Sequence, residues 1–340
     1  MKRFLSLILA ICLLISLSSC SPQKETLKIY NVGEYIDASV LTDFEKEYNC
    51  TVIYDEFNTN EEMYVKIAND DTAYDVVVPS DYTIDRLIQE DRLAKIDKNN
   101  VSNISEVSKS YLNPEYDKSN DYSIPYMVGT LGIIYNKKLT EKEIDSWSSL
   151  WDNNYKGKIF MWDSVRDAFT PPFVLNKVSI NTEKNSDIEN AKKMLIKQKP
   201  LVQAYIGDET KAKMVNGEGV AALLYSGDAY AAIQENNDLA YVVPKEGSNK
   251  WVDGFCILKN TKHKKLAEDF INFMCRPDIA TRNMEETGYT SPVEKSWDEF
   301  DKDDKTMFPD DSILNRCEPF LYSKTLTEKL SKAWEEVKAK

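Results

Sequence analysis

The stretch LKIYNVGEYIDASVLTDFEKEYNCTVIYDEF, residues 27–57, starts a regular alternation of strand-like and helical patterns that extends to residue 92. The strand-like runs are 27–32, 52–54 and 76–78. The helical patterns, which place their apolar side chains on one face, are 38–48, 61–69 and a segment from Tyr82 onward. This βαβαβα order predicts a mostly parallel sheet with helices on its faces, and therefore an α/β fold.

A second region of the same character lies beyond residue 130. Its strand-like runs are 130–135, 158–162, 220–225, 241–243 and 251–258. Its helical patterns are 144–151, 187–198, 209–216, 264–275 and a C-terminal segment after Thr325. Hydrophobic residues make up 42% of the chain and charged residues 29%, which excludes wholesale disorder. Because domains usually contain about 150 residues, we expect two domains in this chain.

The charge balance restricts the partners of the protein. Acidic residues outnumber basic residues 56 to 43, which gives a formal net charge of -13. Such a chain repels phosphate backbones, which disfavours nucleic acid as a partner, and it attracts cations. The single histidine, His263, precedes two lysines, which excludes poly-histidine metal sites and argues against a histidine-based triad. The acidic run 298–304 lacks the glycine and the final glutamate of an EF-hand, so we predict no metal or cofactor.

The N-terminus has the pattern of an export signal. Two basic residues precede an apolar run over 4–17, which is shorter than the roughly 20 residues that a membrane-spanning helix needs. The run ends in Leu-Ser-Ser-Cys, which resembles the bacterial lipobox, whose cysteine is lipidated. We therefore predict a lipoprotein signal peptide over 1–19 and a lipid anchor and tether over 20–26, with Cys20 as the lipidated residue. The alternative is that Cys20 is an ordinary signal-peptide residue.

Export determines both the location of the protein and the chemistry open to its cysteines. A lipid at Cys20 anchors the protein on the outer face of the cytoplasmic membrane or in the periplasmic space, and no second apolar run is long enough to span a membrane. An oxidising compartment permits one or two disulfides, and buried free thiols are equally consistent with the sequence. The cysteines concerned are Cys50, Cys256, Cys275 and Cys317.

The segments that follow the predicted strands, where ligands bind in open α/β sheets, are rich in acids and aromatics. The candidate ligand residues in these segments and further along the chain are Glu34, Tyr35, Ser80, Asp81, Tyr82, Asp163, Ser164, Asp167, Tyr225, Asp228, Trp251, Asp253, Tyr289 and Glu318. Arg166 is the exceptional base among them. Carboxylates accept hydrogen bonds from ammonium groups, and aromatic faces attract cations and pack against methylenes. This composition predicts a ligand with several positive charges joined by apolar stems.

These residues also have alternative roles. Asp81 and Asp228 are placed to cap helices, Asp167 would pair with Arg166 at a surface, and the tyrosines would belong to the core or its rim. Asp163 and Asp167 would act as acid and base in a carboxylate-pair hydrolase, but no specific catalytic motif accompanies them. We therefore do not predict an enzyme.

Several of these segments, in this order, resemble the spermidine/putrescine-binding proteins of bacterial ABC importers. The resemblance extends from Leu27 to the C-terminus and is carried by YNVGEY at 30–35, YDVVVPSDY at 74–82, YSIPY at 122–126, WVD at 251–253 and GYTSP at 288–292. It implies a two-lobed periplasmic-binding-protein fold of type II, in which each lobe is a mostly parallel sheet flanked by helices. The lobes would be joined by a two-crossover hinge and close on the ligand.

The resemblance also implies where the lobes begin and end. The expected crossovers lie near 129–134 and 251–255. Lobe 1 would comprise 27–131 and 253–297, and lobe 2 would comprise 132–252 and 298–340.

The resemblance further implies which side chains touch the ligand. The positions that match the family in residue type are Tyr35, Ser80, Tyr82, Asp167, Trp251, Asp253 and Tyr289. Asp167 and Asp253 would hold amine groups, Trp251 and the tyrosines would enclose the aliphatic chain, and Glu34 would lie near a terminal amine. The chain departs from the family at Val32 and Tyr225, where relatives often have tryptophan, and at Ser164, where some have a carboxylate that Asp163 would replace.

The expected function is therefore capture of a polyamine and its delivery to ABC permease subunits of the inner membrane that work with a cytoplasmic ATPase. The departures leave the choice between spermidine and putrescine open. Two alternatives remain: a receptor of the same fold for another cation or small solute, which Val32 favours, and a surface lipoprotein with no ligand cleft.

Overall fold

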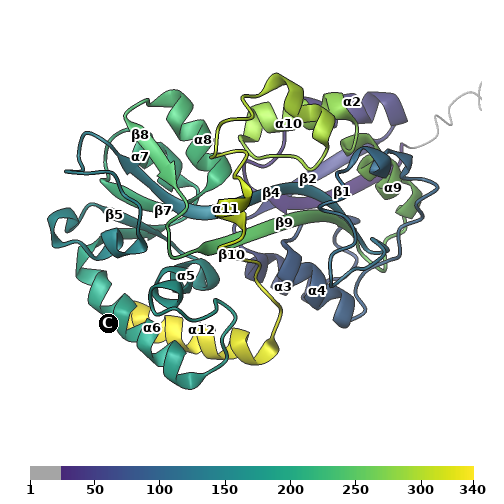
Figure 1. Cartoon of the computed structure of the whole chain (residues 1–340). Helices are drawn as coiled ribbons and strands as arrows, with labels where there is room; N and C mark the ends of the chain where they lie inside the picture. Colours follow the sequence, from purple (N-terminus) through teal and green to yellow (C-terminus); the bar gives the residue numbers. More distant parts are fainter. Residues whose placement is uncertain (1–23) are drawn as a thin grey trace, which may run out of the picture.

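The computed structural model describes residues 24–340 (Figure 1). The predicted signal peptide and the predicted lipidation site at Cys20 lie outside the described residues. Within the described part of the chain, no helix combines the length and the apolar character that crossing a bilayer requires.

The N-terminal region forms the predicted succession of strands and helices. Its elements are β1 (Thr26–Val32), α2 (Ala38–Tyr48), β2 (Thr51–Phe57), α3 (Asn60–Asn69), β3 (Val76–Val77) and α4 (Asp81–Gln89). β1 pairs in parallel with both β2 and β3. We call the part of the protein built on these three strands the first lobe.

The first lobe buries both faces of its sheet. Successive side chains of a strand point to opposite faces, so neighbours in β1 enter different cores. Ile29 packs in a cluster with Phe44 of α2, whereas Tyr30 packs with Met63 of α3 and Leu87 of α4. Both faces of β1 are therefore covered around Ile29 and Tyr30, while Lys28 of the same strand is exposed.

The middle of the chain forms a second lobe around another set of parallel strands. Its elements are β5 (Ile159–Trp162), α5 (Val165–Leu175), α6 (Asn185–Gln198), β6 (Val202–Ile206), α7 (Glu209–Val215), β7 (Ala221–Tyr225), α8 (Ser226–Glu235) and β8 (Leu239–Val242). β5 pairs in parallel with β6 and β7. The expected mostly parallel sheet flanked by helices is therefore present in both lobes.

Two long strands connect the lobes, namely β4 (Ser123–Asn136) and β9 (Ser248–Ile257). They pair antiparallel with each other from Ser123 and Cys256 to Thr130 and Lys250, and Figure 1 shows them side by side in the middle of the molecule. β9 also pairs with β3 of the first lobe, and β4 also pairs with β7 and β8 of the second. The segments predicted to cross between lobes lie within these two strands, while the exact lobe boundaries stay a prediction.

The C-terminal elements return to both lobes. They are α9 (Lys264–Met274), α10 (Pro277–Thr287), α11 (Asp311–Leu314), β10 (Cys317–Glu318) and α12 (Lys324–Ala339). α9 and α10 cover the same face of the first sheet as α2, and α12 lies beside α6 in the second lobe (Figure 1). Leu330 and Trp334 of α12 join the core of the second lobe together with Phe169 of α5.

The prediction of a helix over 144–151 is wrong. The structure has a 3₁₀-helix over Trp147–Trp151, which begins where the Ser146 side chain accepts a hydrogen bond from the backbone of Ser148. Trp147 and Leu150 are both buried, and a spacing of three residues fits three residues per turn. The apolar pattern alone did not distinguish this short turn from an α-helix.

Five strands and α-helices had no sequence prediction, namely α5, β6, α10 and the short elements α11 and β10. α5 contains Pro171 and Pro172 in its interior, residues that normally mark the end of a helix. It nevertheless continues to Leu175, and its residues are almost entirely buried against the second lobe. Tertiary packing therefore overrides the local proline signal.

The four cysteines of the described chain are all buried and free. Burial raises the pKa of the Cys275 thiol to about 12 and also raises that of Cys256. The structure therefore takes the second of the two alternatives, in which the thiols act as small apolar core residues.

Candidate functional site

A pocket lies between the lobes, and most of the predicted ligand residues line it. These residues are Glu34, Tyr35, Ser80, Tyr82, Ser164, Asp167, Tyr225, Asp228, Trp251, Asp253 and Tyr289. Val32, at the position that departs from the family, also lines the pocket.

The topology explains why residues so distant in sequence meet. Glu34 follows β1 and Ser80 follows β3, so both lie at the carboxyl ends of parallel strands in the first lobe. Asp167 follows β5 and Asp228 follows β7, at the corresponding edge of the second lobe. Because the two edges face each other, the strand-end rule for open sheets brings both groups into one cleft.

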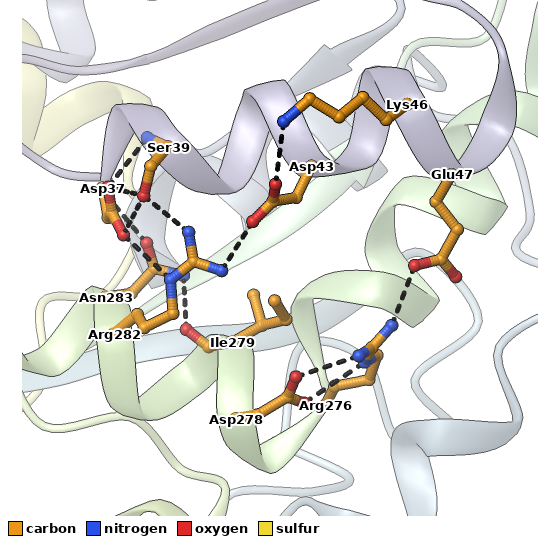
Figure 2. Close-up of polar contacts among 10 residues, drawn as sticks. All are labelled: Asp37, Ser39, Asp43, Lys46, Glu47, Arg276, Asp278, Ile279, Arg282 and Asn283. Carbon is orange, nitrogen blue, oxygen red and sulfur yellow. Dashed lines mark hydrogen bonds and ion pairs between the residues drawn. The ribbon is translucent and has the colours of Figure 1, made fainter.

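The loop that carries Glu34 and Tyr35 is fixed by α10 (Figure 2). Asp37, the N-cap of α2, donates its backbone N–H to Oδ1 of Asn283 at 2.9 Å and accepts a hydrogen bond from Nε of Arg282 at 3.1 Å. The carbonyl oxygen of Tyr35 accepts a hydrogen bond of 2.6 Å from the hydroxyl of Tyr126. The loop therefore holds Tyr35 in place before any ligand arrives.

Three tyrosine hydroxyls donate to three carboxylates in the pocket. Tyr35 donates to Asp253 at 2.9 Å and Tyr225 donates to Asp167 at 2.8 Å. Tyr289 donates to Asp228 at 2.7 Å. Each pair presents an apolar ring beside an acceptor oxygen, which suits an alkylammonium group.

Asp253 has a further feature that distinguishes it. The residue is only 6% exposed, and its Oδ1 atom accepts no hydrogen bond from the described residues, while the Ser80 and Tyr35 hydroxyls beside the carboxyl act to lower its pKa. A buried carboxylate oxygen without a donor costs free energy, on the order of 1–3 kcal/mol or more for a charged group. Asp253 therefore presents an unfilled acceptor toward the pocket that it lines.

Burial changes the acidity of these carboxyl groups. It raises the pKa of Asp253 and of Asp167 to about 6, because removal from water disfavours the charged form. Burial together with the nearby Asp228 and Glu34 charges raises the pKa of Asp208 to about 6. A cation in the pocket would reverse this cost by pairing with the ionised forms.

Aromatic rings form a continuous set of edge-to-face contacts through the pocket. Trp251 lies 6.1 Å from Tyr225 and 5.4 Å from Tyr289, measured between ring centroids. Tyr35 lies 5.1 Å from Tyr289, and Trp162 lies 5.0 Å from Tyr225. These rings supply the surface against which methylene groups would pack.

Tyr289 reaches the pocket through close packing between the lobes. Gly288 ends α10 with a φ of 74°, a conformation that favours glycine. The ring of Tyr289 lies against Gly227 of α8, where an added Cβ would be 2.3 Å from a ring atom. A larger residue at position 227 would therefore displace Tyr289 or separate the lobes.

The structure does not bring three predicted ligand residues into the pocket. Asp81 is the first residue of α4, and its carboxylate accepts a hydrogen bond from the N–H of Tyr82 at 2.7 Å, so it serves the helix N-terminus. Asp163 is exposed and pairs with Lys338 of α12 at 3.2 Å. Glu318 accepts a hydrogen bond from the hydroxyl of Ser179. Because Asp163 pairs with Lys338, it does not replace the carboxylate that some relatives have at the position of Ser164.

The alternative pairing of Asp167 with Arg166 is also not formed among the described residues. Arg166 is 4% exposed and its guanidinium carbon lies 4.3 Å from the centroid of the Phe320 ring. Its nitrogens donate to the carbonyl of Leu321 and to Oδ1 of Asn181. Arg166 thus does not line the pocket itself but packs against Phe320 and Tyr82, which do.

The sequence analysis missed several residues at the site. The pocket is also lined by Glu61, Trp162, Asp208, Asn249 and Phe320. Asp208 follows β6 as Asp167 follows β5, so the strand-end rule would have found it had β6 been recognised. Phe320 lies in an irregular segment near the C-terminus, and no local signal marks it.

Comparisons with known proteins agree with this geometry. A family described as "Bacterial extracellular solute-binding protein" matches residues 39–309. The spermidine/putrescine-binding periplasmic protein of Escherichia coli (strain K12) is 36% identical over 298 residues, which is 86% of each chain.

Solved structures show the same relationship. A putative spermidine/putrescine ABC transporter protein from Listeria monocytogenes has a TM-score of 0.89 and 36% identity, and the match covers 93% of this chain and 99% of that one. The spermidine/putrescine ABC transporter substrate-binding protein from Streptococcus pneumoniae, in complex with calcium and HEPES, has a TM-score of 0.79 and 33% identity with the same coverage. Since these relatives bind substrates for ABC transporters and are not enzymes, the chain is a binding protein. It belongs to the bacterial extracellular solute-binding protein family.

Proposed function

We propose that this protein captures a polyamine, spermidine or putrescine or both, in the pocket between its lobes and delivers it to an ABC importer. The observation that carries the proposal is the buried, unpartnered Oδ1 of Asp253 in a pocket walled by tyrosine and tryptophan rings. An ammonium group supplies the missing donor together with a compensating charge. The printed names of the relatives from Escherichia coli, Listeria monocytogenes and Streptococcus pneumoniae support a polyamine as the ligand.

The pocket offers separate acceptors for more than one amine. Asp253 bonds to Tyr35 and Asp167 bonds to Tyr225, and each carboxylate keeps acceptor capacity for a ligand. Each charge-assisted hydrogen bond contributes about 1.5–3 kcal/mol, and each cation–π contact contributes about 0.5–2 kcal/mol. A few such contacts, with burial of the methylenes, reach the roughly 8 kcal/mol of a micromolar complex.

Calorimetric titration with spermidine and with putrescine, in parallel, tests the proposal. The sample is ligand-free protein from Ser21 onward, checked for folding by circular dichroism. We expect binding of one ligand per protein, with unequal affinities for the two amines. The absence of binding to both by folded protein would contradict the polyamine proposal and favour a different solute for the same cleft.

We further propose that the protein is exported and held at the membrane by a lipid on Cys20, where it meets the permease subunits and their cytoplasmic ATPase. The support is the basic and apolar N-terminal pattern that ends in Leu-Ser-Ser-Cys. Lys24 and Glu25 precede β1 directly, so the anchor would join the first lobe.

Substitution Cys20→Ala is expected to abolish lipidation. In cells labelled with a radioactive fatty acid, the wild-type protein should carry label and fractionate with membranes, whereas the variant should carry none. A Cys12→Ala variant, which changes a cysteine inside the apolar run, is the matched control and should be labelled normally. Equal labelling of the Cys20→Ala variant would contradict the anchor.

A further inference from the structure

Lys211 is a basic residue at the edge of the acidic pocket. It lies on α7 of the second lobe, and its ammonium group forms an ion pair with Glu34 of the first lobe. The same ammonium lies 3.8 Å from Oδ1 of Asp228. Lys211 is 24% exposed at its side chain, so its charge is partly shielded from water. The Lys211 ammonium therefore lies beside two carboxylates that line the pocket.

Two carboxylates pair with that ammonium, and a third lies close enough to feel its charge. Glu34, Asp208 and Asp228 all line the pocket, and the charge of Lys211 acts on Asp208 as well as on its two closer partners. An added Cβ at Gly33 would lie 3.1 Å from Oδ2 of Asp208, so this end of the pocket is closed by contact between the lobes. We call Glu34, Asp208 and Asp228 the acidic end.

The acidic end is separate from the acceptors formed by Asp253 and Asp167. Tyr289 links to the acidic end through Asp228, whereas Tyr35 and Tyr225 bond to Asp253 and Asp167. A diamine needs two acceptors, and Asp253 and Asp167 supply them. A triamine carries a third ammonium, and the pocket offers two further places with carboxylates to receive it, the acidic end and Glu61, whose carboxylate accepts a hydrogen bond from Tyr82.

We propose that Lys211 is a specificity-determining residue, an internal ammonium that competes with the third amine of a triamine for the acidic end. The inference rests on the proposed polyamine function and goes further by assigning the selectivity to one side chain. Lys211 stabilises the acidic end with its own charge, which lowers the gain from a ligand ammonium there. A longer polyamine that places its third amine at the acidic end displaces or shares this ion pair, whereas a diamine bound at Asp253 and Asp167 leaves it intact. The competition therefore lowers affinity for spermidine more than for putrescine.

Substitution Lys211→Gln tests the inference through a ratio of affinities. We expect spermidine binding to tighten by on the order of tenfold, as one positive charge is removed from the acidic end, and putrescine binding to change by less than about threefold. Lys211→Arg keeps the charge and should keep the wild-type ratio. Titration calorimetry of both amines against each variant gives the ratio directly.

Lys213→Gln is the matched control for the overall charge. Lys213 lies two residues further along α7 and pairs with Glu218, whereas Lys211 pairs with Glu34 and Asp228 of the acidic end. The same loss of one charge there should leave the ratio of the two affinities unchanged. A thermal melt of each variant confirms that the lobes are folded.

The outcomes separate this inference from the function on which it rests. Competition at the acidic end is supported if the ratio of spermidine affinity to putrescine affinity rises in Lys211→Gln and does not rise in Lys213→Gln. An equal loss of both affinities would mean that the Glu34–Lys211 pair only holds the lobes together, and an equal gain would mean a general field effect; both overturn the inference and leave the function standing. Wild-type protein that binds neither amine overturns the polyamine function itself.

Discussion

Asp253→Asn is expected to weaken spermidine binding by about 30- to 150-fold, equivalent to about 2–3 kcal/mol for a lost charge-assisted hydrogen bond. Asp253 is the carboxylate with a buried acceptor oxygen that no described donor satisfies. The amide keeps the shape of the side chain and an oxygen for Tyr35, but it removes the negative charge and turns one polar atom into a donor. That donor would face an ammonium, which is itself only a donor. Titration calorimetry at pH 7.5 measures the change.

Asp163→Asn is the matched control for this substitution. Asp163 follows β5, and Asp253 lies on the crossover strand β9. Asp163 is exposed and pairs with Lys338 outside the pocket. Its loss should change spermidine affinity by less than about threefold, since exposed ion pairs contribute about 0–1 kcal/mol. An affinity for spermidine that Asp253→Asn leaves at the wild-type value would remove Asp253 from the site.

Stability measurements distinguish a binding defect from a folding defect. Asp253 is ionised and buried at pH 7.5, so neutralising it removes a cost to the ligand-free fold. The melting temperature of ligand-free Asp253→Asn should therefore equal or exceed that of the wild type. Added spermidine should raise the melting temperature of the wild type much more than that of the variant.

The fold was largely predictable where strands are buried and helices have one apolar face. Residues 27–32 and 76–78 read as strands since both Ile29 and Tyr30 enter a core, and the intervening helices have one apolar face. Where packing opposed the local signal, prediction failed. Pro171 and Pro172 in α5 indicate a helix end, but the helix is held by the surrounding core.

The strand-end rule found most of the pocket but did not determine side-chain direction. Asp167 and Asp163 flank the same short segment after β5, yet only Asp167 lines the pocket, because α5 begins between them and turns the two side chains to different sides. Lys211 lies on a helix after the unrecognised strand β6, and it meets Glu34 only through contact between lobes. A contact between residues of two lobes leaves no local mark in the sequence.

Polyamine affinity is expected to fall steeply between pH 7.5 and pH 5. Burial raises the pKa of Asp167 and of Asp253 to about 6, so both are ionised at pH 7.5 and about nine-tenths protonated at pH 5. The ligand ammonium needs the ionised form, so each carboxylate that contacts it lowers the affinity about tenfold over this range, and two lower it about 100-fold. Calorimetry in buffers of different ionisation enthalpy should also detect protons released on binding near pH 6.

The same pKa shift has the opposite consequence for the ligand-free protein. In the unfolded chain an aspartate has a pKa of about 3.9, so between about pH 4 and 6 the folded state binds more protons than the unfolded state. The contribution of Asp167 and Asp253 to stability is therefore greatest below pH 4 and is lost as the pH rises through 6. In the complex, the ligand keeps both carboxyl groups ionised. The stability of the complex relative to the free protein therefore increases as the pH rises over the same interval.

Melting temperatures measured from pH 5 to 7.5, with and without spermidine, test these opposite slopes. The increase caused by spermidine should be small at pH 5 and large at pH 7.5. In Asp253→Asn, the increase caused by spermidine should depend less on pH, by the contribution of about one proton, because one titrating contact is gone. Asp163→Asn should reproduce the wild-type profile. A ligand-induced increase that does not vary with pH would mean that the ligand ammonium groups do not contact Asp167 or Asp253, since pairing with a carboxylate of raised pKa necessarily displaces its proton.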